Sequence, residues 1–277
     1  MKDEAKKSME KSIVENDITI SEMPVKADEQ FDVQIVTAKR YPRNVVRVID
    51  NAVATVARNE ATAATCGYAL PRAGKKIQGP SVHLARIIAQ FYGNIRVQVR
   101  AGEVSHKYVT ACAIAFDLEN NYAIQIDARR KILDKDGNRY KEDMINTTML
   151  AAMAIAERNA IFKVIPQAII DEVYQASVHK LTGDLSDEKK LVARRKTMLD
   201  EWLKNYDVTE KDILEMFGKQ TISQITADDI ATLIGLWQSL KDGETTIEQQ
   251  FPRFQKPEEK KEKPTKENLF DNQNPES

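Results

Sequence analysis

The sequence has few cysteines and histidines and no long apolar run, and each shortage excludes a class of protein. Its 277 residues include only Cys66 and Cys112, which lie among small or apolar neighbours, as buried thiols in a reducing cytosol do. The three histidines have no metal-ligand spacing with either cysteine, so no zinc site is expected. No apolar run approaches the ~18 residues of a membrane span, and residues 1–12 lack the apolar core of a signal peptide. We therefore expect a cytoplasmic protein with no membrane partner.

Phosphate-binding loops are also missing. Neither a GxxxxGK[ST] nor a GxGxxG pattern occurs, and residues 74–81, GKKIQGPS, hold similar residue types in the wrong order. Since nothing would cradle a triphosphate, ATP-driven strand exchange and helicase activity are not expected. We expect a protein that is not an enzyme and uses no cofactor.

Two aspartates offer the nearest candidate for a catalytic site. Asp117 and Asp127 flank a predicted turn, so they could approach each other across a hairpin and bind a divalent ion, as in nucleases. Arg129 stands where such nucleases place a lysine, and arginine is a poor base at neutral pH. A metal-dependent DNA nuclease is therefore an alternative, beside a structural role in which both aspartates pair with arginines.

Charge is distributed unevenly along the chain. Residues 1–30 carry 5 Lys and Arg against 8 Asp and Glu, residues 31–180 carry 21 against 14, and residues 181–277 carry 15 against 20. The middle segment thus has a net charge of +7 between two acidic flanks. This asymmetry is typical of a polyanion-binding domain with solubilising ends.

Hydrophobic periodicity predicts an α+β core over residues 31–180. Its central feature is a three-stranded antiparallel β-meander packed with long helices. The expected elements, in order, are a helix at 41–66, a loop or short hairpin at 67–80, a helix at 82–92, strands at 95–100, 107–116 and 122–133, and helices at 142–164 and 166–179.

The flanks differ from this core. Residues 1–30 are polar and aperiodic, which predicts a flexible arm. Residues 181–251 predict a small helical module, because Thr209 and Thr226 each precede an aspartate by three residues, as helix-capping boxes do. Residues 252–277 are rich in Lys, Glu and Pro, which predicts a disordered tail.

Basic side chains gather where these elements meet. Such a grouping predicts a groove that neutralises phosphates and binds a single strand without reading its sequence. The candidate DNA-binding residues are Arg72, Lys75, Lys76, Arg86, Arg129, Arg130, Lys131, Arg158 and Lys163.

Two segments resemble phage-type single-strand annealing proteins of the RecT/Redβ-like group. Residues 79–86, GPSVHLAR, followed by YGN at 92–94 and a three-stranded meander, form the first. The second, AERNAIFKVIP at 156–166, is similar to an A-x-R-x-x-x-K-x-x-P helix end. His83 and Arg86 depart from the Arg and Glu expected at these positions in the group, which leaves Arg86 either a DNA contact or a structural residue.

The resemblance implies a function and a set of partners. Such proteins bind single-stranded DNA, form homo-oligomeric rings or filaments, and anneal complementary strands without ATP. It also implies that residues 181–277 dock a phage exonuclease or a host single-strand-binding protein. A phage assembly protein that oligomerises without DNA is a further alternative.

Overall fold

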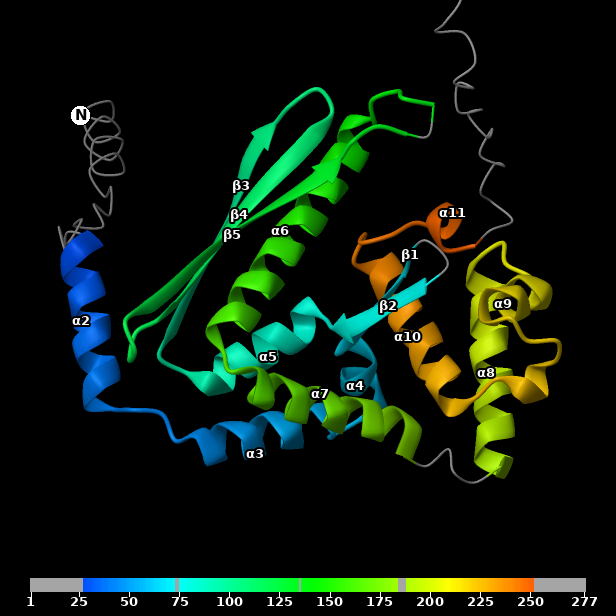
Figure 1. Ribbon diagram of the computed structural model, residues 1–277, viewed down its shortest axis with the longest axis horizontal. Coiled ribbons are helices and arrows are strands. Elements are labelled where there is room, and N and C mark those ends of the chain that lie inside the picture. The colour runs from blue at the N-terminus through cyan, green and yellow to red at the C-terminus, as the bar shows by residue number, and fades with distance from the viewer. Residues whose placement is uncertain (1–26, 73–74, 135, 184–187, 252–277) are drawn as a thin grey trace, which may run out of the picture.

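The computed structural model describes residues 27–72, 75–134, 136–183 and 188–251, with only the backbone described at residues 27–30, 71–72 and 75–77. Over this range the fold is α+β, as the sequence predicts, with a three-stranded antiparallel sheet, a two-stranded hairpin and helices around them (Figure 1). The predicted tail and residues 1–26 of the predicted arm lie outside the described residues.

In the described part of the chain, three helices precede the first strand: α2 (Ala27–Arg40), α3 (Val45–Val56) and α4 (Glu60–Thr65). The prediction of one helix over residues 41–66 was wrong, because two asparagines each start a separate helix. Asn44 accepts a hydrogen bond from the backbone N–H of Arg47, and Asn59 accepts one from Thr62. Capping of this kind satisfies N–H groups that lack a partner within the helix.

Strands β1 (Gly67–Arg72) and β2 (Lys75–Pro80) form an antiparallel hairpin. The sequence left a loop or a short hairpin open for residues 67–80, and the hairpin is the one that forms. Helix α5 (Val82–Tyr92) follows, with Ser81 accepting a hydrogen bond from the backbone N–H of Leu84 at its start. Gly93 ends the helix with a positive φ of 62°, a conformation that favours glycine.

The predicted meander is confirmed. It consists of β3 (Ile95–Val104), β4 (Tyr108–Asp117) and β5 (Tyr122–Lys131), paired antiparallel in the order β3-β4-β5. β3 and β5 are therefore edge strands. β3 runs past its predicted end at residue 100, and its pairing with β4 is irregular between Ala101 and Val104.

Helix α6 (Glu142–Val164) packs along one face of this sheet, and α7 (Gln167–Thr182) turns away after Pro166 (Figure 1). The contact between α6 and the sheet is built largely from alanine, because small side chains let a helix approach a strand closely. The buried alanines are Ala111, Ala113 and Ala115 of β4 and Ala128 of β5 with Ala152, Ala156 and Ala160 of α6.

The C-terminal helices are α8 (Glu188–Asn205), α9 (Glu210–Phe217), the short 3₁₀ helix η2 (Ile222–Gln224), α10 (Ala227–Lys241) and α11 (Ile247–Gln250). Thr209 and Thr226 form the two predicted capping boxes. None of the helices in the described ranges is both long and apolar enough to cross a membrane.

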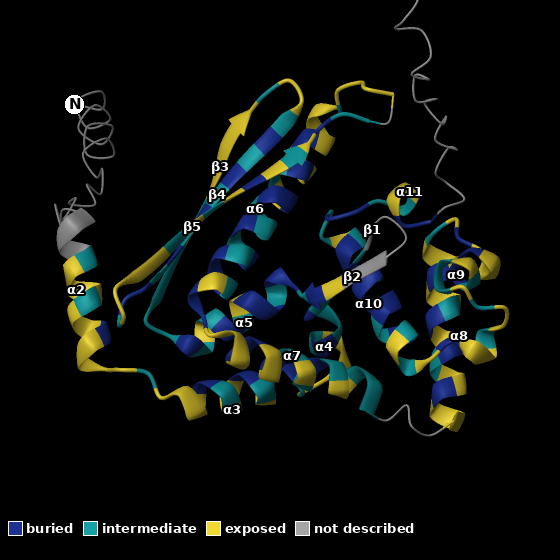
Figure 2. Cartoon of the chain, viewed as in Figure 1, coloured by how far each residue is buried: buried dark blue, intermediate teal, exposed yellow. Residues whose placement is uncertain are grey.

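Helix α10 packs directly against strand β1 (Figures 1 and 2). A Cβ added at Gly235 would lie 3.1 Å from the backbone nitrogen of Ala69, so the two backbones approach as closely as glycine permits. The backbone N–H of Ala69 donates to the hydroxyl of Ser239 (3.2 Å). Ala69 also belongs to the apolar cluster of the C-terminal helices around Trp202, so those helices share a core with the hairpin.

Candidate nucleic-acid interface

The two sides of the three-stranded sheet differ in chemistry because side chains alternate along each strand. In β4 one set is buried against α6, and the other set is half-buried on the opposite side. We call this opposite side, with the residues paired to it on the neighbouring strands, the open face. Its members are Arg96, Gln98, Arg100, Tyr108, Thr110, Cys112, Ile114, Phe116, Ala123, Gln125, Asp127, Arg129 and Lys131.

The open face carries four cations and one carboxylate. Arg100 on β3, and Arg129 and Lys131 on β5, are exposed, so cations line both edge strands. The carboxylate, Asp127, lies in the same cross-strand row as Cys112 and Arg100. The arrangement is a strip with positive charge on both borders, which suits a polyanion laid along it.

Aromatic rings support two of these cations. The guanidinium of Arg129 lies over the ring of Tyr108, 3.9 Å from its centroid. At the other end of the strands, Arg96 lies 5.0 Å from the ring centroid of Phe31 on α2. Phe31 in turn stacks on Phe116 of β4, with ring centroids 5.0 Å apart and an interplanar angle of 7°. These contacts restrict the guanidinium groups and anchor α2 to one end of the open face.

A hollow of about 480 Å³ lies between β3 and β4 at this face. Its lining combines aliphatic, amide and thiol groups beside one cation. The lining residues are Val97, Gln98, Val99, Arg100, Cys112 and Ile114. Burial raises the pKa of the Cys112 thiol and Asp127 raises it further, whereas Arg100 lowers it.

The predicted basic residues do not all share this face. Arg129 and Lys131 belong to it, but Arg130 points to the opposite side of the sheet, where it donates to the backbone carbonyl of Glu244 (3.0 Å). Arg158 of α6 is 8% exposed, and its Nη1 lies 3.0 Å from Oε1 of Glu244. Arg130 and Arg158 are therefore covered by the C-terminal part of the chain.

The remaining predicted residues lie elsewhere. Arg86 of α5 makes a two-point ion pair with Glu157 of α6, at 2.9 and 2.6 Å, on the protein surface. The sequence left Arg86 either a DNA contact or a structural residue, and its ion pair with Glu157 is a structural contact. Lys163 is exposed near the C-terminal end of α6.

Arg72, Lys75 and Lys76 stand at the end of the hairpin farthest from its base. The register pairs Arg72 with Lys75 across the hairpin, next to residues 73–74. The side chains of these three residues lie outside the described part of the structure.

Asp117 and Asp127 do not come together. Asp127 pairs with Cys112 on the open face, whereas Asp117 is a buried residue at the far end of β4 on the α6 side. Asp117 accepts hydrogen bonds from Arg43 and from Asn120, both at 2.7 Å. Burial alone would raise the pKa of Asp117, but these bonds outweigh it and lower the pKa to about 2. Asp117 thus has a structural role and pairs with an arginine, as in the alternative to a nuclease site.

Metal-ligating side chains do not cluster in the described ranges, where no group of three His, Cys, Asp or Glu residues is placed to hold an ion. The two-aspartate site expected of a nuclease is therefore not assembled by this fold.

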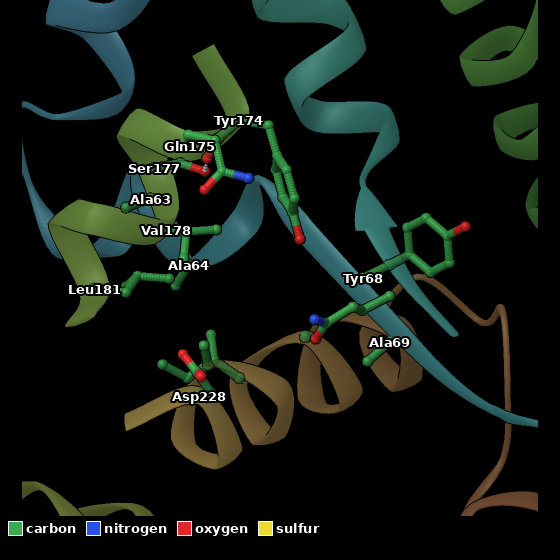
Figure 3. A pocket seen from close by; sticks show the side chains of 15 residues that line it. Ala63, Ala64, Tyr68, Ala69, Tyr174, Gln175, Ser177, Val178, Leu181 and Asp228 are labelled. Carbon is green, nitrogen blue, oxygen red and sulfur yellow. Dashed lines mark hydrogen bonds between the residues drawn. The ribbon is translucent and has the colours of Figure 1, made fainter. Parts of the chain in front are cut away.

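Another hollow, of about 250 Å³, lies between α4, α7, α10 and β1 (Figure 3). Tyr174 and Tyr68 border it, and Asp228 stands on its α10 side. Burial raises the pKa of Tyr174. The described residues of its lining include no Lys or Arg, so this hollow does not suit a phosphate.

Several residues of the site were not among the predicted ones. Arg96 and Arg100 were outside the nine candidates, although their period-two alternation with Val97 and Val99 along β3 indicates one polar face. Glu244 had no local signal, because its role depends on residues more than 80 positions away in the sequence.

Comparisons with protein-family models, with curated proteins and with solved structures find no match to this chain.

Proposed function

We propose that this protein binds single-stranded DNA along the open face of its sheet and anneals complementary strands without ATP, in phage-type homologous recombination. The observation that carries the proposal is the pair of cationic borders, Arg96 and Arg100 on β3 and Arg129 and Lys131 on β5, on either side of a face that α2 contacts at one end. A strand lying along this face has cations within reach of its phosphates on both sides.

The openness of this face suits annealing. A protein that closes a channel around a strand hides its bases, whereas annealing requires base edges that a second strand can reach. Gripping phosphates rather than base edges also makes binding independent of sequence. The resemblance of residues 79–94 and 156–166 to RecT/Redβ-like proteins supports the same function.

The proposal includes self-association, as the resemblance implies. The helices α2 and α3 and the segment that joins them carry large apolar side chains that are exposed, a feature that often marks a protein interface. These are Val33, Val36, Tyr41, Val45 and Val46. Light scattering of the purified protein with and without DNA measures the assembly size.

A protein partner, an exonuclease or a single-strand-binding protein, is proposed to dock on the C-terminal helices. An apolar hollow of about 420 Å³ lies between α8, α9 and η2, with Val192, Leu199 and Leu203 in its lining. Val192 and Leu203 are exposed there, which makes this the part of the module best suited to a partner.

The test of the DNA site is a double charge reversal on its two borders, Arg100→Glu with Arg129→Glu. We expect the double variant to bind an oligothymidylate more weakly. The plot of the logarithm of the binding constant against the logarithm of the salt concentration should also be shallower, by about 0.7 for each phosphate that is no longer neutralised. The matched control is Lys180→Glu with Lys204→Glu, which changes the charge equally at exposed positions on α7 and α8. Equal affinities of the two double variants would refute the open face as the DNA site.

Annealing is measured separately. Complementary labelled strands mixed with the wild-type protein, at low salt and without nucleotide, should pair faster than strands alone. Strand shortening in the presence of magnesium would instead indicate a nuclease, and the absence of any DNA binding would favour an assembly protein.

A further inference from the structure

Glu244 is a buried residue that two arginines contact, one at its carboxylate and one at its backbone carbonyl. It is 3% exposed and follows α10 in the bend that leads to α11. Its Oε1 accepts from Arg158, and its backbone carbonyl accepts from Arg130. Its other carboxylate oxygen, Oε2, is buried and has no hydrogen-bond partner among the described residues. The burial of this carboxylate is therefore only partly compensated by hydrogen bonds.

Arg158 also has a support that does not involve Glu244. The guanidinium of Arg158 lies over the ring of Tyr68 on β1, 4.3 Å from its centroid. Arg130 is fixed by β5, between the two cations that line the open face. Burial lowers the pKa of Arg130 and raises the pKa of Glu244, so each charged form is disfavoured by the loss of water.

The bend that carries Glu244 is shaped to lie beside α6 (Figure 1). Gly243 has a positive φ of 67°, and a Cβ added there would lie 3.3 Å from the side chain of Thr147 on α6. Next to it, Asp242 lies 3.1 Å from the ring nitrogen of His83 on α5. The C-terminal part of the chain therefore presents two acidic side chains, separated by one glycine, to basic groups of the core.

We propose that Arg130, Arg158 and Tyr68 form a binding site for a phosphate group and that the Glu244 carboxylate occupies this site in place of the phosphate. A phosphate has more acceptor oxygens than a carboxylate and pairs with guanidinium groups through two hydrogen bonds at once. It could therefore accept from both guanidinium groups, whereas the Glu244 carboxylate accepts from Arg158 and Arg130 donates to the backbone carbonyl.

The position of the site indicates one source of phosphate. β5 is an edge strand, and Arg130 lies between Arg129 and Lys131, whose side chains point to the open face. A DNA backbone that leaves the open face across this edge reaches Arg130 next. Displacement of Glu244 by the strand would extend the binding surface, and this part of the inference rests on the proposed function.

The experiment compares Glu244→Ala with Glu248→Ala in the full-length protein. Glu248 is an exposed residue of α11, so its replacement removes the same charge without opening the site. The first readout is thermal unfolding in inorganic phosphate and in chloride at equal ionic strength. We expect phosphate to stabilise the Glu244→Ala variant by several degrees more than the control, because an anion that binds only the folded state raises its stability.

The second readout is the affinity for a fluorescein-labelled oligothymidylate. We expect Glu244→Ala to bind about tenfold more tightly than the control, with a log–log salt slope steeper by about 0.7 for one more neutralised phosphate. Glu244→Ala leaves two arginines without a counter-charge, which disfavours folding, so Glu244→Gln and Glu248→Gln are measured in parallel. The glutamine retains the shape but loses the charge that attracts the arginines, so a gain in affinity in the same direction, but smaller, is expected.

The outcomes separate the two proposals. The phosphate site is overturned if phosphate stabilises Glu244→Ala and Glu248→Ala equally. If Glu244→Ala does not fold, equal DNA affinity of Glu244→Gln and Glu248→Gln overturns it. A phosphate response without a gain in DNA affinity supports the site and identifies a free phosphate as its ligand. Failure of the wild-type protein to bind DNA refutes the proposed function but leaves the phosphate readout intact.

Discussion

Cys112 is a natural reporter at the centre of the open face, and Cys66 serves as its internal control. Cys112 is half-buried and flanked by Arg100 and Asp127, whereas Cys66 is fully buried, with a pKa raised to about 12 by burial. Thiolates react and thiols do not, so Cys66 should be inert in the folded protein.

We therefore expect a maleimide to label Cys112 alone, slowly at neutral pH and faster as the pH rises, since the pKa of Cys112 is raised above its ordinary value. A bound oligonucleotide should protect Cys112 if the strand crosses the open face. Peptide mass spectrometry after labelling with and without DNA measures both effects. Unchanged labelling at saturating DNA would place the strand elsewhere.

The ion pair of Asp117 with Arg43 should stabilise the fold in a pH-dependent manner. The pKa of Asp117 is lowered to about 2 in the folded protein from an ordinary value of 3.8. Its contribution is thus fully present above pH 3.8 and is lost as the pH falls toward 2. Asp117→Asn should lower the free energy of unfolding by about 2 kcal/mol at pH 7.

Urea denaturation at a series of pH values measures this effect. The difference between wild type and Asp117→Asn should shrink as the pH falls from 4 to 2. The control Asp127→Asn changes an exposed residue and should shift the stability by less than ~0.5 kcal/mol. A difference that does not depend on pH would contradict the assigned role of Asp117.

At the scale of elements, α2 is attached to the sheet mainly through one aromatic contact. Phe31 stacks on Phe116, and Arg96 covers the ring, while Val33 and Val36 of the same helix are exposed. An element with so few buried contacts opens locally without global unfolding.

Phe31→Ala should therefore release α2 while leaving the rest of the fold intact, because an aromatic pair contributes about 1 kcal/mol beyond its buried area. Hydrogen exchange should accelerate over residues 31–40 and remain unchanged in α6. Val36→Ala, at an exposed position, serves as the control. Equal exchange in both variants would show that other contacts hold α2.

At the scale of the whole molecule, the core and the C-terminal helices are joined by shared packing. Ala69 of β1 lies in the apolar cluster of the C-terminal helices, and Glu244 is buried against Arg158 of α6. Elements that share a core unfold together, whereas separate domains unfold in separate steps.

We therefore expect a single unfolding transition. Both tryptophans, Trp202 and Trp237, lie in the C-terminal helices, so their fluorescence reports on that part alone, while far-UV circular dichroism reports on all helices. The two signals should change at the same denaturant concentration. Two distinct midpoints would show instead that residues 181–251 behave as a separate module.

The sequence by itself determined most of the local structure. Alternation along β3, β4 and β5 gave the meander, Pro166 marked the end of α6, and the Thr209 and Thr226 boxes marked two helix starts. These features depend on residues a few positions apart, which is why they can be read from the chain. The break between α3 and α4 was missed because the apolar spacing continues across it, although Asn59 was a local signal for it.

Only the tertiary structure decided which basic residues share a surface. Arg129, Arg130 and Lys131 are consecutive in the sequence, yet the strand directs Arg130 to the side opposite its neighbours. Arg158 is a candidate DNA contact by sequence, but a glutamate 86 residues later covers it. Burial and long-range pairing determine whether a charge faces solvent or another charge, and neither is encoded by the residues next to it in the chain.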